Sequence, residues 1–186
     1  IYGGTFNPIH NAHLLVADQV GHSLSLDQVR FMPDATPPHV DHKTAIDAEL
    51  RLAMIRLAIQ GNPLFGIEES ELRRGGVSYT YDTTKKRSEQ HPTTDYYFII
   101  GGDMVDYLPK WHRIDDLVRL PRFHFVGVRR PGAKNESAYP VIWVDVPLVS
   151  FSSTDIRRRI AQGLPIRYMV PDAVAAFIKE HHLYYE

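Results

Sequence analysis

Two histidines follow a pair of glycines at the start of the chain. The stretch 1–13 contains Gly3, Gly4, His10 and His13. We predict the end of a strand, a turn through the glycines and a helix from about residue 11. Glycines let backbone N–H groups approach a phosphate, and a helix N-terminus adds unpaired N–H groups and partial positive charge. Two imidazoles three residues apart share one side of a helix. The stretch therefore predicts an anion site in which imidazoles donate hydrogen bonds to phosphate oxygens.

Two simpler interpretations of this stretch stay open. Glycines after a strand often shape an ordinary turn, and a histidine pair can also hold a metal. The chain contains no H-E-x-x-H pattern and no obvious third ligand. We therefore expect no protein-held metal at this site.

The elements that must position these residues alternate along the chain. Apolar, β-prone runs predict strands, and capped or amphipathic stretches between them predict helices. The expected strands are 1–2, 29–33, 65–67, 96–100, 123–128 and 141–144; the expected helices are 11–20, 48–60, 78–90, 114–120, 152–162 and 172–181. The charged run 68–74 is expected to be a solvated edge. Continuous apolar strands that alternate with helices favour an α/β fold, with a parallel sheet covered by helices on both faces.

Composition bounds the class of protein. The chain has 186 residues, 44% of them hydrophobic and 23% charged, with a net charge of −1. This suits a single domain, 1–186, whose C-terminal helical part covers about 152–186. The near-neutral charge gives no electrostatic case for nucleic acid or membrane partners. The absence of cysteine and of any expected signal peptide favours a cytoplasmic location. We also expect a few residues of the first strand to precede Ile1.

Two further stretches lie where ligands bind in such sheets, at the carboxyl ends of the strands. Residues 152–157 begin a helix with hydroxyl groups and place Arg157 in its first turn, where a bound anion would offset the unfavourable dipole. This holds if the preceding strand ends near Val149; the alternative is an ordinary cap before a solvated arginine run. Residues 101–111 follow the clearest strand and end in Trp111, which either stacks on a flat ring or packs in the core.

These stretches together resemble one superfamily. Residues 3–13 resemble the G-x-F-x-P-x-H-x-x-H signature of the HIGH-motif nucleotidyltransferases, and 152–157 resembles their S-S-T-x-I-R motif. Residues 101–111, 78–83 and 37–39 are similar to the G-x-D…L-x-x-W, S-Y-T-x-D-T and P-P-H-K segments of bacterial nicotinate-nucleotide adenylyltransferases. The resemblance implies a Rossmann-like, doubly wound fold. It also implies the joining of ATP and nicotinate mononucleotide to nicotinate adenine dinucleotide and pyrophosphate, a step in making NAD.

The resemblance also implies roles for individual residues. His13 would stabilise charge at the α-phosphate, Arg157 would hold the β- and γ-phosphates, and Trp111 would stack on the pyridine ring. Mg²⁺ is expected to arrive with ATP. The implied catalytic residues are His10, His13 and Arg157. The implied ATP-binding residues are Gly3, Gly4, Thr5, Phe6, Ile9, His10, His13, Gly101, Asp103, Ser153, Thr154 and Arg157. The implied acceptor-binding residues are Gly4, Thr5, Thr80, Tyr107 and Trp111.

The chain departs from the family pattern at three positions. Asn7 stands where aspartate is common, Ala12 where glycine is usual and Val40 where a loop lysine is usual, although Lys43 lies nearby. Two rival functions therefore stay open at this point. One is adenylyl transfer to nicotinamide mononucleotide or phosphopantetheine, and the other is a nucleotide-binding module without catalysis. A homo-oligomer also stays open.

Overall fold

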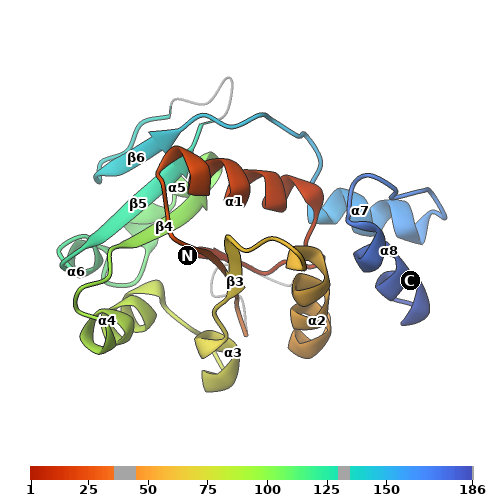
Figure 1. The fold of residues 1–186 in the computed structure, drawn as a ribbon, viewed down its shortest axis with the longest axis horizontal. Helices are drawn as coiled ribbons and strands as arrows, with labels where there is room; N and C mark the ends of the chain where they lie inside the picture. Colours follow the sequence, from red (N-terminus) through yellow and green to blue (C-terminus); the bar gives the residue numbers. More distant parts are fainter. Residues whose placement is uncertain (36–44, 130–134, 186) are drawn as a thin grey trace.

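Six parallel strands form one sheet in the order β3-β2-β1-β4-β5-β6, in a computed structural model that describes residues 1–35, 45–129 and 135–185 (Figure 1). The strands are β1 (Tyr2–Gly4), β2 (Val29–Pro33), β3 (Phe65–Ile67), β4 (Tyr96–Gly101), β5 (Phe123–Val128) and β6 (Val141–Val144). Every neighbouring pair is parallel. The strand order reverses between β1 and β4, which is where open parallel sheets bind their ligands. The predicted doubly wound α/β fold is confirmed.

Helices lie between most of the strands and follow β6, although none is described between β5 and β6. They are α1 (Asn11–Ser23), α2 (Ala48–Ile59), α3 (Ser70–Arg74), α4 (Thr80–Gln90), α5 (Gly102–Val105), η1 (Leu108–Lys110), α6 (Ile114–Leu117), α7 (Ser153–Ala161) and α8 (Asp172–Glu180). The expected cap of α2 is present, because the Asp47 carboxylate accepts a hydrogen bond from the Glu49 N–H at 2.8 Å. The helix expected over 114–120 ends early, at Leu117, since Pro121 disfavours a helical conformation in the residue before it.

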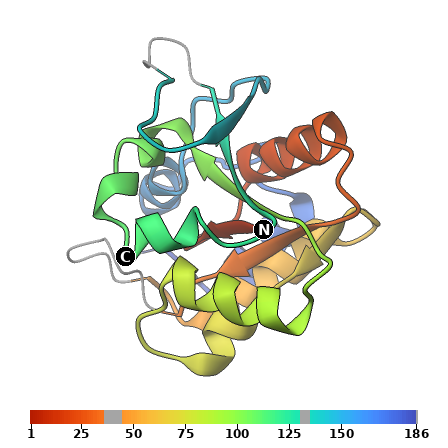
Figure 2. The same cartoon turned by 90° about the vertical axis from the view of Figure 1, so that its left-hand side faces the viewer.

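Apolar side chains pack on both faces of the sheet. Successive strand residues alternate between faces: Ile99 belongs to one cluster, and Phe98 and Ile100 belong to the other. The first cluster includes α1, α2, α7 and α8, and the second includes α4, η1 and α6. Figure 2 shows α1 (red) and α4 (yellow-green) on opposite sides of the strands.

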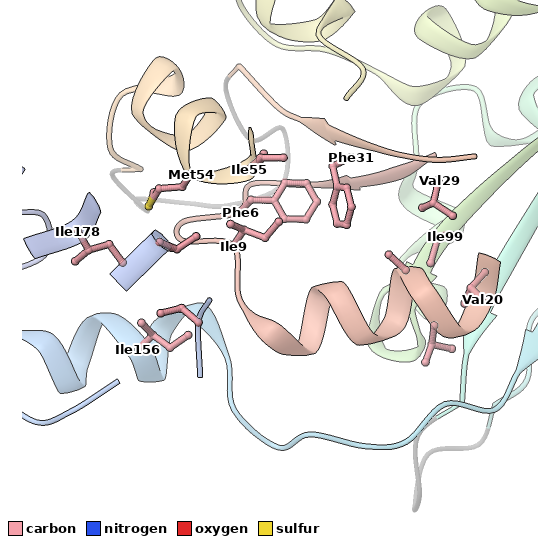
Figure 3. Packing of buried hydrophobic residues seen from close by; sticks show 14 of the residues in the cluster. Phe6, Ile9, Val20, Val29, Phe31, Met54, Ile55, Ile99, Ile156 and Ile178 are labelled. Carbon is pink, nitrogen blue, oxygen red and sulfur yellow. The ribbon is translucent and has the colours of Figure 1, made fainter. Parts of the chain in front are cut away.

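The C-terminal helices share the first cluster. Figure 1 shows α7 and α8 side by side at one end of the molecule, next to α2. Ile156 and Ile178 bring these helices into the cluster that also holds Ile9 and Met54, and Figure 3 shows these side chains close together. Among the described residues, no helix is both long and apolar enough to cross a membrane.

The charged run 68–74 is not the solvated edge that we predicted. Glu68 and Glu71 are each only 5% exposed. Arg87 of α4 forms an ion pair with Glu68, and the Thr83 hydroxyl donates to Glu71 Oε1 at 3.1 Å. The prediction was wrong for these two residues because α4 covers them and supplies the partners that compensate for their burial.

Candidate active site

The chain turns after the glycines rather than through them. Gly3 and Gly4 lie inside β1, where a Cβ on Gly3 would be 2.9 Å from Phe98 Cζ. The turn itself has Phe6 in the left-handed region, at φ 49°, followed by a cis peptide bond between Asn7 and Pro8. Gly3 therefore allows β1 to pack closely against Phe98, and the loop that follows makes the turn.

His10 and His13 form a stacked pair at the start of α1. Their ring centroids are 3.6 Å apart with an interplanar angle of 17°. His10 is the N-cap residue, and its backbone N–H donates to His13 Nδ1 at 3.2 Å. A neutral imidazole whose Nδ1 accepts must hold its proton on Nε2. The helix start thus fixes the His13 tautomer and leaves Nε2–H as its donor.

Both histidines are neutral near pH 7. Burial lowers the pKa of His10 to about 4. Burial also lowers the pKa of His13 well below its usual range, and the neighbouring His10 lowers it further. The pair therefore offers neutral hydrogen-bond donors to an anion instead of positive charge.

A large cavity of about 680 Å³ opens beside the histidines. Its wall has a polar part, where the loop after β1 meets the start of α7, and an apolar part at 146–149. The polar part includes Thr5, Asn7, His10, His13, Ser153, Thr154 and Arg157, and the apolar part includes Val128, Val146, Pro147, Leu148, Val149 and Phe151. A flat base and a chain of phosphates need these two environments side by side.

The start of α7 is bonded to the loop after β1. The Ser153 hydroxyl donates to the Pro8 carbonyl at 2.8 Å, and Arg157 Nη1 donates to the Asn7 carbonyl at 2.7 Å. Arg157 Nη2 also lies 3.2 Å from Thr154 Oγ1. The strand predicted over 141–144 is confirmed as β6, which does not extend to Val149. The segment after β6 still brings the start of α7 to the cavity.

A second cavity, of about 150 Å³, adjoins the first. Tyr2 and Gly101 line both, and Thr80 and Trp111 line the second. The Trp111 ring packs edge-on against Phe98, with centroids 6.0 Å apart. Trp111 therefore does both things that the sequence left open: it packs against the second apolar cluster and presents a ring to a cavity. Gly3 and Gly4 line this second cavity and not the first.

Several predicted site residues are not brought into either cavity. Tyr107 is 53% exposed and lies under Lys110 Nζ, and it lines neither cavity. Ile9 is fully buried in the first cluster, so its side chain supports the loop from inside. Asp103 belongs to α5, but its side chain lies outside what the structure describes. The predicted P-P-H segment, with Val40 and Lys43, also lies outside the described residues.

Arg51 supports the loop beside the site, and sequence reasoning missed it. It is 1% exposed, and its guanidinium donates to the carbonyls of Thr5 at 2.7 Å and Asp34 at 2.8 Å. Thr5 Oγ1 also donates to Asp34 Oδ2 at 2.9 Å. Burial raises the pKa of Asp34, while these bonds from Thr5 and Arg51 oppose the rise. The sequence did contain a signal for this role, because Arg51 stands among the apolar residues that form the inner side of α2.

Comparisons with known proteins identify the family and the fold of this chain. The cytidylyltransferase-like family pattern matches residues 1–159. The chain is 60% identical over 184 residues to the probable nicotinate-nucleotide adenylyltransferase of Lactiplantibacillus plantarum, covering 99% of this chain and 86% of that one. The Enterococcus faecalis relative of the same name is 56% identical over 184 residues, with 99% and 83% covered. This chain belongs to the nicotinate-nucleotide adenylyltransferase family.

Solved structures of low sequence identity support the fold. The nicotinic acid mononucleotide adenylyltransferase of Plasmodium falciparum, solved with NaAD, superposes with a TM-score of 0.83 at 20% identity, covering 98% of this chain and 95% of that one. A nicotinate-nucleotide adenylyltransferase described as putative, from Vibrio parahaemolyticus, gives a TM-score of 0.73 at 21% identity, with 100% and 93% covered. These structures confirm the fold, and the relatives that are 60% and 56% identical confirm the family assignment made from sequence.

Proposed function

We propose that the large cavity binds ATP and the adjoining smaller cavity binds the pyridine end of nicotinate mononucleotide. The reaction is adenylyl transfer from ATP to nicotinate mononucleotide, which gives nicotinate adenine dinucleotide and pyrophosphate in NAD biosynthesis. A single observation supports the site assignment most: the two cavities meet at Tyr2 and Gly101, beside the histidine pair. The two substrates can therefore meet at their phosphates while their rings stay apart.

His13 acts on the charge that develops during transfer. An oxygen of the acceptor phosphate attacks the α-phosphorus, and the bond from that phosphorus to the bridging oxygen breaks as pyrophosphate leaves. The acceptor phosphate is already ionised, so the reaction needs positioning and charge stabilisation more than a strong base. The neutral His13, held by the His10 backbone, donates its Nε2–H to an α-phosphate oxygen. Such a donor needs no reorganisation during the reaction.

Arg157 binds the phosphates and also holds the loop after β1. Its Nη1 holds the Asn7 carbonyl, and its charge lies at the polar wall of the large cavity. A guanidinium has five N–H donors, so one can hold the loop while others remain for the β- and γ-phosphates. The first turn of α7, with Ser153 and Thr154, adds hydroxyl and backbone donors to the same wall.

The smaller cavity suits the acid form of the pyridine nucleotide. Thr80 begins α4, whose first N–H groups lack a side-chain cap. A carboxylate accepts hydrogen bonds from such N–H donors. The amide of nicotinamide would instead place an N–H₂ group against them, so that buried N–H groups would be left without acceptors. Discrimination of roughly 10⁴-fold is within the range of sites built on hydrogen bonds. Trp111 contributes by stacking.

Mg²⁺ fits this site as a companion of ATP. The residues described around the large cavity include no carboxylate, and the described chain contains no cluster of three or more His, Asp or Glu residues suited to a metal. Such a site matches a cation that is held mainly by phosphate oxygens and water. When bound, Mg²⁺ would neutralise charge on the leaving pyrophosphate, and this chain would contribute donors from His10, Arg157 and α7. We further propose that the protein acts in the cytoplasm, where ATP is available.

Pyrophosphate release tests this proposal. The wild type is assayed with ATP and a panel of acceptors: nicotinate mononucleotide, nicotinamide mononucleotide and phosphopantetheine. We expect release with the first acceptor and far less with the others. His13→Ala should lower kcat by roughly 10²-fold, the usual cost of losing one preorganised donor. His22→Ala, an exposed residue on the same helix, is the matched control. Comparable rates for the acid and the amide would overturn the acceptor assignment, and a normal rate in a folded His13→Ala variant would overturn the role of His13.

A further inference from the structure

Ser78 is a buried residue in an exposed stretch. It is 5% exposed, while its neighbours Val77 and Tyr79 are 51% and 37% exposed. Ser78 immediately precedes the N-cap residue of α4. The backbone thus turns a small polar side chain inward just before this helix begins.

Ser78 is one of the residues that line the smaller cavity, together with Thr80 and Trp111. Its hydroxyl oxygen is buried and has no hydrogen-bond partner among the described residues. A buried hydroxyl without a partner costs free energy, so native proteins nearly always satisfy such groups, often with a ligand or an ordered water. The Ser88 hydroxyl on α4 is also buried without a described partner, but it lines neither of these cavities. The two serines differ in that only Ser78 borders a cavity in which a ligand could bind.

The first N–H groups of α4 also lack a side-chain partner. The helix has 11 residues, and Tyr79 at its N-cap provides no side-chain hydrogen bond. Thr80, the first helical residue, lines the cavity next to Ser78. Free backbone N–H groups and an unpaired hydroxyl therefore meet at one wall of one cavity. Both would be satisfied by a polar group with acceptor oxygens.

We propose that Ser78 binds the acceptor substrate, with its hydroxyl hydrogen-bonded to the polar substituent on the pyridine ring of nicotinate mononucleotide. This rests on the proposed function. The position favours the ring end because Phe98 and Trp111 form aromatic walls of this cavity. The phosphate end must instead reach the larger cavity near Gly101, where the two cavities adjoin. A serine hydroxyl can donate to a carboxylate, and in doing so it gains the partner that it lacks in the free protein.

Removing the hydroxyl should have opposite effects on stability and on binding. In the free protein, Ser78→Ala deletes an unsatisfied buried group, so the melting temperature should stay equal or rise. In the complex it deletes a hydrogen bond, so the KM for nicotinate mononucleotide should rise about tenfold, as expected for about 1.4 kcal/mol. The KM for ATP and kcat should change little, because Ser78 does not line the larger cavity. A residue with a purely structural role would not separate these quantities.

Two further variants complete the experiment. Ser88→Ala is the matched control and should leave both KM values unchanged. Ser78→Cys keeps the size but donates weakly, so it should show a smaller rise in the acceptor KM than Ser78→Ala. An unchanged acceptor KM in a stable Ser78→Ala variant would overturn the proposal, as would equal rises in the KM for ATP and for the acceptor. If the wild type itself does not use nicotinate mononucleotide, the proposed function fails, and that result is distinct from a failure confined to Ser78.

Discussion

The neutral state of His10 makes the protein less stable as the pH falls. Burial lowers the pKa of His10 from the usual 6.5 to about 4 in the folded protein. The unfolded chain therefore binds a proton at this residue while the folded protein still excludes it. The stabilising contribution is fully present above pH 6.5 and is lost as the pH falls from 6.5 toward 4.

The size of the effect follows from the two pKa values. At about pH 5 the unfolded chain is almost fully protonated at His10, and the folded protein is about one-tenth protonated. Each pH unit is equivalent to about 1.4 kcal/mol, so moving from about pH 7.5 to pH 5 costs about 2 kcal/mol at this residue. His13 has its pKa lowered in the same direction and adds to the loss.

Urea unfolding at the two pH values measures this loss, and a non-titrating variant isolates it. His10→Asn keeps a good N-cap residue at the start of α1. Between about pH 7.5 and pH 5 the wild type should lose about 2 kcal/mol more of its free energy of unfolding than His10→Asn does. Titrating groups away from the histidine pair affect both proteins alike and cancel in the difference, and burial, the larger cause, lowers the pKa of His13 in both. Equal losses in the two proteins would refute the reasoning, because His10 would then titrate similarly in the folded and unfolded states.

Three more outcomes are expected around the site. Arg157→Ala should lower kcat/KM for ATP by roughly 10²-fold, the scale of a lost charge-assisted hydrogen bond, and Arg157→Lys should recover part of it. Arg158→Ala, an exposed neighbour, is the control, and equal effects at the two positions in steady-state kinetics would contradict the assignment. Trp111→Ala should raise the KM for the acid and for the amide alike; a changed ratio would mean that Trp111 also selects. Tyr184→Phe should lower the free energy of unfolding by about 1 kcal/mol and raise the KM for ATP, because its hydroxyl holds the loop after β1. Tyr185, which is half exposed, provides the control: Tyr185→Phe should change neither the stability in thermal unfolding nor the KM for ATP in kinetic assays.

The strands and long helices could be predicted because local patterns determine them. β2 and β3 begin and end at the predicted residues, 29–33 and 65–67. α7 begins after Ser152, as its cap predicts, and Gly163 in the left-handed region follows its end. The sheet edge at which the loop after β1 and the segment after β6 lie was also predictable, because parallel strands all end at one edge, and both segments line the same cavity.

Long-range burial could not be predicted in this way. Arg51 looks like a solvated break in an apolar helix until Asp34 and the loop after β1 enclose it. Glu68 and Glu71 look like surface charges because their partners lie on α4, well along the chain. In each case the sequence shows the charge but not the element that covers it.

Two of the departures from the family pattern, Asn7 and Ala12, are consistent with activity because the structure preserves what those positions supply. Asn7 is 6% exposed, and its Oδ1 accepts the Tyr184 hydroxyl at 2.8 Å. An aspartate offers the same acceptor oxygen, so asparagine keeps this contact without burying a charge. Ala12 lines the large cavity in the first turn of α1, and its single methyl group is the smallest addition to the glycine that is usual there. The loop is therefore held by Tyr184 from the turn after α8, by Arg157 from α7 and by Arg51 from α2. A nucleotide-binding module without catalysis would have no need to fix the His13 tautomer beside such a loop.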